Sequence, residues 1–286
     1  MDEIEQPGIL YIPDKTTDKI VIHVHGLNGN FYENRFLDTL AKSYTDKGYA
    51  FLTFNNRGKD FIAELLKGDG FTVIGGSLER FKDCILDIEG VVSWVKQKGY
   101  KEITLEGHSY GCNKVLYYYN KKKEDCINKI VLLAPCDIPS EGKKFLSEEE
   151  YNKAKVESTR LVNEGKENEL IDFSVMANGK IAAGTYYNDF LPGGENDFIR
   201  YTEDINDMNE VLNSIDIPVL VVFGDADECV LTQPIDKVKV YLNNNIKNCN
   251  IKIINGADHS YCNKYEELGI ITVSYTHLRA HETLAN

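Results

Sequence analysis

Seven short apolar segments, rich in β-branched residues, constrain the fold of this 286-residue chain more than any other feature. They lie at residues 8–13, 19–26, 49–58, 102–107, 129–136, 217–224 and 251–259. Several are almost continuously apolar, which is typical of strands that are buried on both faces of a parallel sheet. Between them lie helical patterns, the clearest from Leu78 to Val95. The sequence therefore predicts an α/β fold with a doubly wound, mostly parallel sheet.

The alternation of strands and helices stops between Ile138 and Ile217. A connection of this length far exceeds the usual linker of about 2–6 residues, so it is read as an insertion. We predict an α/β core formed by residues 1–138 and 217–271, with a cap or lid at residues 139–216. A surface excursion without a role is the alternative, but long insertions in compact domains are usually functional.

Two local features refine this picture. Within the insertion, Ser147 and Glu150 have the spacing of a capping box that opens a helix. At the C-terminus, the string TVSYTHLRAHETLAN resembles translated sequencing-adapter DNA instead of protein-coding sequence. We therefore predict that residues 272–286, with His277 and His281, are a non-native tail, and we leave them out of the fold prediction. One face of the sheet is then expected to be partly uncovered.

The net charge of −13 limits the partners that the chain can bind. A negative surface repels phosphates, so we expect neither nucleic acid nor a membrane as a partner. The N-terminus lacks the pattern of a signal peptide, and the apolar runs are too short to span a bilayer. Seven cysteines without CxxC pairs argue against a disulfide framework, so a cytoplasmic location is expected. The sequence does not indicate an oligomeric state.

One short motif carries candidate chemistry. In EITLEGHSYG, Ser109 lies between Gly107 and Gly111, after a strand pattern and before a helical one. G-x-S-x-G in this context is a nucleophile elbow, a strained turn that lifts a serine hydroxyl above the sheet. Cys112, three residues later, is expected to pack in the core. The chain has no Walker loop, GxGxxG, HExxH or paired cysteine–histidine spacing, so we expect no cofactor and no metal.

From about residue 8 to residue 270 the chain resembles the α/β-hydrolase fold family. The resemblance rests on HVHGLNGN, NNRG, GHSYG, FGDADECV and GADHS, which follow the order of the family. Within that family it is most similar to small capped esterases and other serine hydrolases. The family order is nucleophile, then acid, then histidine.

A serine nucleophile needs a general base, which a third group orients. Outside the tail, the histidines are His23, His25, His108 and His259. The first lies within a strand pattern, the second precedes a strand-end glycine and the third neighbours the nucleophile. We therefore predict His259 as the base.

The orienting acid comes from FGDADECV, which offers Asp225, Asp227 and Glu228. The family pattern places the acid three residues after the glycine, which implies Asp227 and leaves the other two as alternatives. The resemblance also implies an oxyanion hole made by the backbone N–H groups of Tyr110 and Leu27.

Further candidates surround these groups. His25 and Gly26 are expected to support the loop that carries the second oxyanion donor. An aromatic-rich stretch of the insertion supplies candidate lid residues that would face a substrate, although aromatic side chains can equally anchor such a loop to the domain. The lid candidates are Tyr186, Tyr187 and Phe190, with Phe198 and Tyr201 nearby.

Taken together, these residues predict a serine hydrolase that cleaves a small-molecule carboxylic ester through a Ser109–His259–Asp227 triad and an acyl-enzyme intermediate. An amidase, a peptidase or an acyltransferase could use the same residues, because a fold does not determine its substrate. Outside the enzyme class, the alternative is a non-catalytic ligand-binding protein of the same fold. The sequence does not indicate which acyl or alcohol group fits.

Overall fold

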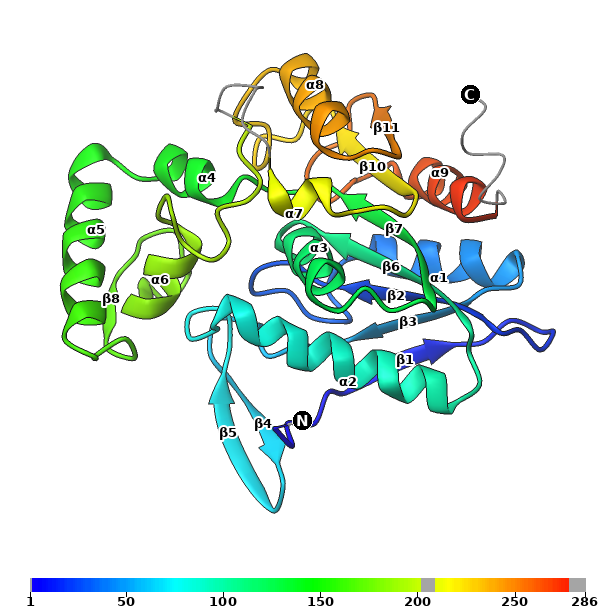
Figure 1. Cartoon of the computed structure of the whole chain (residues 1–286), viewed down its shortest axis with the longest axis horizontal. Helices are drawn as coiled ribbons and strands as arrows, with labels where there is room; N and C mark the ends of the chain where they lie inside the picture. The colour runs from blue at the N-terminus through cyan, green and yellow to red at the C-terminus, as the bar shows by residue number, and fades with distance from the viewer. Residues whose placement is uncertain (1, 202–208, 278–286) are drawn as a thin grey trace.

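The computed structural model describes residues 2–201 and 209–277. Its central strands are β1 (Gly8–Tyr11), β2 (Lys19–Val24), β3 (Ala50–Phe54), β6 (Glu102–His108), β7 (Ile127–Leu133), β10 (Val219–Gly224) and β11 (Cys249–Ile254). Within the described residues these seven form one sheet, in the order β1-β3-β2-β6-β7-β10-β11 (Figure 1). Of the strands in this sheet, only β1 is antiparallel to its neighbour. The predicted mostly parallel α/β sheet is confirmed, and each predicted segment overlaps one strand.

Alternate residues of the central strands enter two separate apolar cores. On β2, Ile20 and Ile22 pack in one core and Val21 packs in the other. The helices α2 (Cys84–Gln97), α3 (Tyr110–Lys122) and α8 (Ile235–Asn245) cover the first core. The helices α1 (Phe36–Asp46) and α9 (Tyr265–His277) cover the second. Burial on both faces explains why the strand segments are continuously apolar.

The last helix corrects the sequence prediction. Helix α9 extends over residues 272–277, where Val273 and Tyr275 are buried in the second core. The carbonyl oxygen of Thr276 accepts a hydrogen bond of 2.5 Å from Lys129 Nζ on β7. These residues therefore cover the sheet face that was expected to be partly uncovered, whereas the non-native origin of residues 272–286 stays a prediction.

Helix α2 begins later than its apolar pattern predicts. The backbone N–H of Leu78 bonds back to Gly75 in a turn, and a 3-10 helix at Phe81–Asp83 precedes the α-helix. Before this turn lies a hairpin that the sequence analysis did not predict, formed by β4 (Ala63–Lys67) and β5 (Gly70–Ile74). It projects from the body of the molecule (Figure 1).

The inserted region has its own helices, which gather at one side of the molecule (Figure 1). They are α4 (Ile138–Phe145), α5 (Glu148–Asn163) and α6 (Ala183–Asp189), with a short hairpin of β8 (Leu170–Asp172) and β9 (Lys180–Ala182); α7 (Glu210–Asn213) leads into β10. The predicted capping box is confirmed, because Ser147 Oγ accepts from the N–H of Glu150 and the Glu150 carboxylate accepts from the N–H of Ser147.

Two predictions about the organisation of the chain are not tested by the structure and stay predictions. They concern the limits of core and cap, and the adapter-like origin of the C-terminal string, of which His281 lies outside the described residues. All seven cysteines carry free thiols. Across the described ranges, no helix combines the length and the apolar character that crossing a membrane requires.

Candidate active site

Ser109 lies in a sharp turn between β6 and α3. Its backbone has φ 56° and ψ −131°, and a positive φ of this kind is strained for a residue with a side chain. The turn is tied to the sheet, because the N–H of Ser109 donates to the carbonyl of Leu133 on β7 at 2.8 Å. The turn therefore presents Ser109 at the carboxyl end of β6, where parallel sheets bind their ligands.

The glycines on either side of Ser109 are required by close packing. A Cβ atom on Gly107 would lie 2.6 Å from the backbone nitrogen of Cys112. A Cβ atom on Gly111 would lie 2.8 Å from the carbonyl oxygen of His25, at the end of β2. Real Cβ atoms do not come this close to backbone, so only glycine allows the turn to rest on both neighbouring segments.

The loop after β2 reaches the serine. A Cβ atom on Gly26 would lie 2.9 Å from Ser109 Cβ and 3.3 Å from its Oγ, so any other residue would collide with the side chain of Ser109. This close approach brings the following residue, Leu27, to the neighbourhood of the serine, and Leu27 packs against the first core.

His25 fixes the shape of this loop. Its buried imidazole accepts from the N–H of Asn56 through Nε2 at 3.1 Å, so its Nδ1 carries the hydrogen and donates to the carbonyl of Gly26 at 2.9 Å. Burial lowers the pKa of His25 to about 3. The imidazole is therefore neutral at physiological pH. It supports the loop after β2 through its two hydrogen bonds, to Asn56 and to Gly26.

His259 and Asp227 meet at the same edge of the sheet. His259 lies in the loop after β11, and Asp227 lies in the loop after β10. His259 Nδ1 is 2.9 Å from Asp227 Oδ2. The other carboxylate oxygen accepts from the backbone N–H groups of Cys229 at 2.9 Å and Val230 at 3.2 Å. Because an ionised carboxylate only accepts, His259 Nδ1 donates and Nε2 keeps its lone pair.

The alternative acids have other partners. Asp225 is exposed, and its Oδ1 accepts from the N–H of Gly256 at 2.6 Å. Glu228 offers its backbone carbonyl to Lys144 Nζ at 2.5 Å. Among the described residues, Asp227 is thus the one acid of the three whose side chain contacts His259.

His108 has a role in this geometry that the sequence analysis missed. Its buried ring donates from Nε2 to the carbonyl oxygen of His259 at 2.9 Å and packs on Phe36, with ring centres 4.9 Å apart. Burial holds the pKa of His108 well below its usual value. The only signal in the sequence was its position beside Ser109. By contrast, His23 is buried away from the serine in a pair with Glu106, at 2.8 Å.

The Ser109 hydroxyl faces a cysteine. Its Oγ lies 3.4 Å from Cys136 Sγ, just after β7, and within the described residues no hydrogen bond joins it to His259. Burial raises the pKa of the Cys136 thiol well above its usual value, so the thiol is neutral. Cys112 packs in the core as predicted, with its thiol donating to the carbonyl of Gly107 at 3.1 Å.

The inserted region is joined to the serine turn by a buried hydrogen bond. Tyr110, the residue after Ser109, donates from its hydroxyl to Asp189 Oδ2 at 2.8 Å, at the end of α6. Burial raises the pKa of Asp189 well above its usual value. This contact ties Tyr110, whose backbone N–H is one of the expected oxyanion donors, to the inserted region.

The candidate lid aromatics are mostly buried among themselves. Tyr186 and Phe190 stack with ring centres 5.7 Å apart, and both contact the ring of Phe173 edge-on, at 5.2 and 4.8 Å. Tyr187 is partly buried against the first apolar core. Phe198 packs on Phe81 and Tyr117, and Tyr201 packs on Tyr241. In this arrangement they anchor the inserted region by packing, and their contact with a substrate stays a prediction.

Three side chains at this site offer different metal-ligating atoms. Asp227, Cys229 and His259 each place one such atom within 4.8 Å of the others. The sequence gives no sign of this cluster, because the three residues lack the paired spacing of known metal motifs and meet only through the fold.

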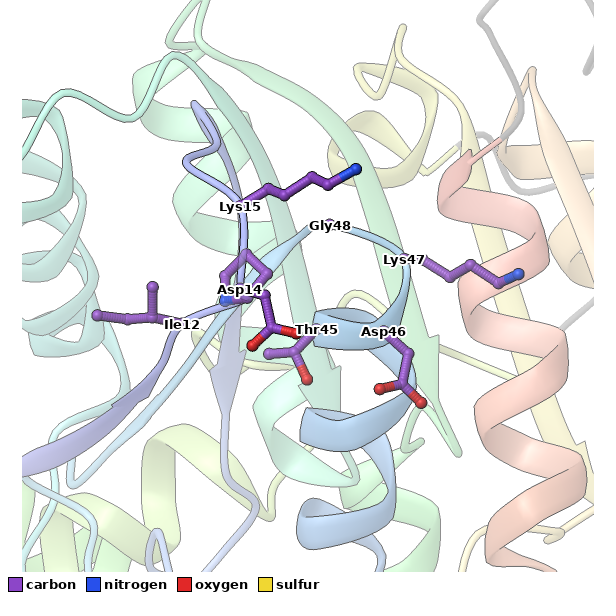
Figure 2. Close-up of a pocket in the computed structure, with 8 residues that line it drawn as sticks. Ile12, Asp14, Lys15, Thr45, Asp46, Lys47 and Gly48 are labelled. Carbon is purple, nitrogen blue, oxygen red and sulfur yellow. The ribbon is translucent and has the colours of Figure 1, made fainter.

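A hollow lies at the end of the sheet opposite Ser109, between the turn after β1 and the end of α1 (Figure 2). It is lined by Ile12, Pro13, Asp14, Lys15, Thr45, Asp46, Lys47 and Gly48. These residues precede β2 and β3, so they lie at the amino ends of the parallel strands. Ligands of such sheets bind at the carboxyl ends, where Ser109 lies.

Comparison with known proteins identifies relatives along almost the whole chain. A sequence model of the family described as "Serine aminopeptidase, S33" matches residues 15–266. A protein of Synechocystis sp. named "Putative non-heme chloroperoxidase" is 26% identical over 277 residues, which cover 88% of each chain.

Two solved structures share the fold. Est1E from Butyrivibrio proteoclasticus, with ferulic acid bound, has a TM-score of 0.67 at 20% identity and matches 100% of this chain and 98% of its own. A monoacylglycerol lipase from Paleococcus ferrophilus has a TM-score of 0.61 at 17% identity, over 96% and 98% of the two chains.

Proposed function

The chain belongs to the serine aminopeptidase S33 family of α/β hydrolases, and we propose that it is a carboxylesterase that acts through an acyl-enzyme on Ser109. In this proposal His259 is the general base, Asp227 orients it, and the substrate is a small carboxylic ester. The observation that carries the proposal is the hydrogen bond of 2.9 Å between His259 and Asp227, at the sheet edge where the strained turn presents Ser109.

The first half of the reaction forms the acyl-enzyme. Ser109 Oγ attacks the ester carbonyl while His259 Nε2 accepts the hydroxyl proton, and the imidazolium that forms keeps its Nδ1–H on Asp227. The backbone N–H groups of Leu27 and Tyr110 donate to the developing oxyanion. The tetrahedral intermediate then collapses, and His259 returns the proton to the leaving alcohol.

The second half repeats these steps with water. His259 takes a proton from a water molecule, which attacks the acyl carbon, and the acid leaves as Ser109 regains its proton. Before the first half, the Ser109 hydroxyl has to turn from Cys136 towards His259, by rotation of its side chain. A thiol is a weak hydrogen-bond partner, so this rotation costs little.

Two features support the assignment of the oxyanion donors. Gly26 brings the loop after β2 into contact with Ser109, and His25 holds the carbonyl of Gly26 by a hydrogen bond of 2.9 Å. Tyr110 is fixed at its other end by Asp189. Preorganised donors of this kind lower a barrier because they need not reorient during the reaction.

An amidase is the second candidate, and the description of the family as an aminopeptidase favours testing it. An amide needs a protonated leaving nitrogen, which the same His259 could supply. Rates for an ester and an amide with the same acyl group separate the two activities. We expect the ester to react faster, and a faster amide would reassign the enzyme.

The proposal is tested with p-nitrophenyl acetate, p-nitrophenyl butyrate and methyl ferulate, the last because Est1E binds ferulic acid. Ser109→Ala is expected to keep the fold, measured by circular dichroism, and to lose both turnover and labelling by a fluorophosphonate probe. Ser260→Ala is the matched control, since Ser260 is an exposed serine beside His259. Turnover at the wild-type rate in Ser109→Ala would overturn the proposal.

A further inference from the structure

Cys229 adds a sulfur to the pair formed by His259 and Asp227. The ligating atoms of the three side chains all lie within 4.8 Å of one another. Cys229 and Asp227 come from the loop after β10, and His259 comes from the loop after β11. Cys229 and His259 are only partly buried, so the group is open to solvent on one side.

From this arrangement we infer that Asp227, Cys229 and His259 form a binding site for a thiophilic divalent cation such as Zn²⁺, and that occupation of the site switches the hydrolase off. Binding is a property of the three side chains alone. The loss of activity rests on the proposed function, in which His259 is the base.

The donor set is the one that Zn²⁺ prefers, with one thiolate, one imidazole nitrogen and one carboxylate oxygen. Two ligands at about 2.0–2.1 Å from a tetrahedral zinc lie about 3.3 Å apart. His259 Nδ1 and Asp227 Oδ2 are 2.9 Å apart, so they need to separate by less than half an ångström. The partial exposure leaves the fourth position to water.

Backbone hydrogen bonds already hold the Asp227 carboxylate in an orientation that suits metal binding. Asp227 Oδ1 accepts from the N–H groups of Cys229 and Val230, which leaves Oδ2 as the oxygen that faces His259. Hydrogen bonds of this kind to a ligand fix its orientation and typically change metal affinity by about 10- to 100-fold. The net charge of −13 also raises the local concentration of cations.

The proton balance explains why the metal inhibits. In the free enzyme Nδ1 of His259 carries a hydrogen and Nε2 is the base. A metal can bind Nδ1 only in the tautomer in which that nitrogen has a free lone pair. In this tautomer the hydrogen of the neutral imidazole lies on Nε2. His259 then has no lone pair to accept the proton of Ser109, and nucleophilic attack stops.

The thiol supplies the proton that leaves. Zn²⁺ binds cysteine as the thiolate, so an ordinary thiol gives up its proton when the metal binds. One proton is therefore released per metal bound, from Sγ to solvent. The occupied site is neutral, because two positive charges meet one thiolate and one carboxylate.

The test first measures binding without reference to activity. Co²⁺ titrated into the wild-type protein is expected to give a thiolate-to-cobalt charge-transfer band, and calorimetry with Zn²⁺ in buffers of different ionisation enthalpy is expected to report about one proton released per metal. Cys229→Ser should abolish the band. Cys262→Ser is the matched control, because Cys262 is an exposed cysteine in the same loop as His259 and should leave the band intact.

The second measurement is inhibition of ester hydrolysis by Zn²⁺, with each variant compared with its own metal-free rate. The half-inhibitory concentration should rise roughly 10-fold or more in Cys229→Ser, and a chelator should restore wild-type activity. Equal inhibition of wild type and Cys229→Ser, or a band that survives Cys229→Ser, would overturn the inference. A band that depends on Cys229 in a protein without esterase activity would instead keep the site and reject the proposed function.

Discussion

The Nε2 atom of His108 donates a hydrogen bond of 2.9 Å to the carbonyl oxygen of His259. His108 immediately precedes Ser109, so this bond ties the nucleophile turn to the loop that carries the proposed base. The two rings also lie against each other, with centres 4.9 Å apart. The relative position of the serine and the imidazole therefore depends on a residue that takes no part in proton transfer.

The first prediction concerns this bond. His108→Phe keeps an aromatic ring against Phe36 but leaves the carbonyl of His259 without its donor. We expect kcat to fall roughly 10- to 100-fold, because small misplacements of catalytic groups are costly, with KM nearly unchanged. The free energy of unfolding should fall by about 0.5–1.5 kcal/mol, the usual net contribution of one hydrogen bond, because this bond is only partly buried.

The matched variant is His108→Gln, which keeps an N–H donor. It should recover part of kcat and of the fluorophosphonate labelling rate at a temperature where all variants are folded. If His108→Phe lost stability but labelled at the wild-type rate, the bond would be structural only.

The second prediction separates the acids of the loop after β10. Asp227→Asn replaces the acceptor of His259 by an amide that can present its N–H₂ instead, which favours the wrong imidazole tautomer. We expect kcat to fall by about 10⁴-fold, as in other triads. Asp225→Asn, the control, should leave kcat within about twofold, because Asp225 bonds to Gly256 and not to His259. Similar losses in both variants would contradict the assignment.

The sequence predicted the parts of this molecule that local patterns determine. Continuous apolar runs are diagnostic of buried parallel strands, and the glycines around Ser109 are diagnostic of a tight turn. The prediction of His259 rests on elimination among four histidines and that of Asp227 on the family spacing after the glycine, and the structure brings their side chains to 2.9 Å.

What the sequence could not predict depends on contacts between distant segments. His108 reaches the carbonyl of His259, and Cys136 reaches Ser109, only because the strands before these residues end at the same edge of the sheet. Cys229 joins His259 for the same reason. The uncovered sheet face was expected because residues 272–277 resemble a non-native string, but Val273 and Tyr275 pack by their apolar surface whatever their origin.

The third prediction is a loss of stability in acid. The pKa of His25 is about 3 in the folded chain, against an ordinary value of 6.5, so between these pH values the unfolded chain binds a proton that the folded chain does not. Stability is therefore lost as the pH falls from 6.5 towards 3. The contribution is on the order of 2–3 kcal/mol between pH 7 and pH 4.5.

This contribution is isolated with His25→Gln, whose amide can accept from Asn56 and donate to Gly26 without titrating. Urea unfolding of wild type and variant at pH 7 and pH 4.5 gives the pH-dependent part of the free energy for each. The variant should lose about 2–3 kcal/mol less on acidification than the wild type. Equal losses would mean that His25 does not carry the effect.

The fourth prediction tests helix α9 as part of the fold. A chain that ends at Ile271 loses the burial of Val273 and Tyr275, each worth about 1.5–3 kcal/mol. It also removes the carbonyl of Thr276, which accepts from Lys129 and from the hydroxyl of Tyr49 at 2.9 Å. Burial lowers the pKa of Lys129 to about 8, so this lysine depends on such acceptors to stay charged where it lies.

We therefore expect this truncation to lower the midpoint of urea unfolding strongly, or to prevent folding. A chain that ends at His277 keeps all of these contacts and should unfold at the wild-type midpoint. If the shorter chain does not fold, Val273→Ala in the full chain gives the same test, with an expected loss of about 1–3 kcal/mol because a buried side chain is shortened. An unchanged midpoint in the chain that ends at Ile271 would show that residues 272–277 add nothing to the fold.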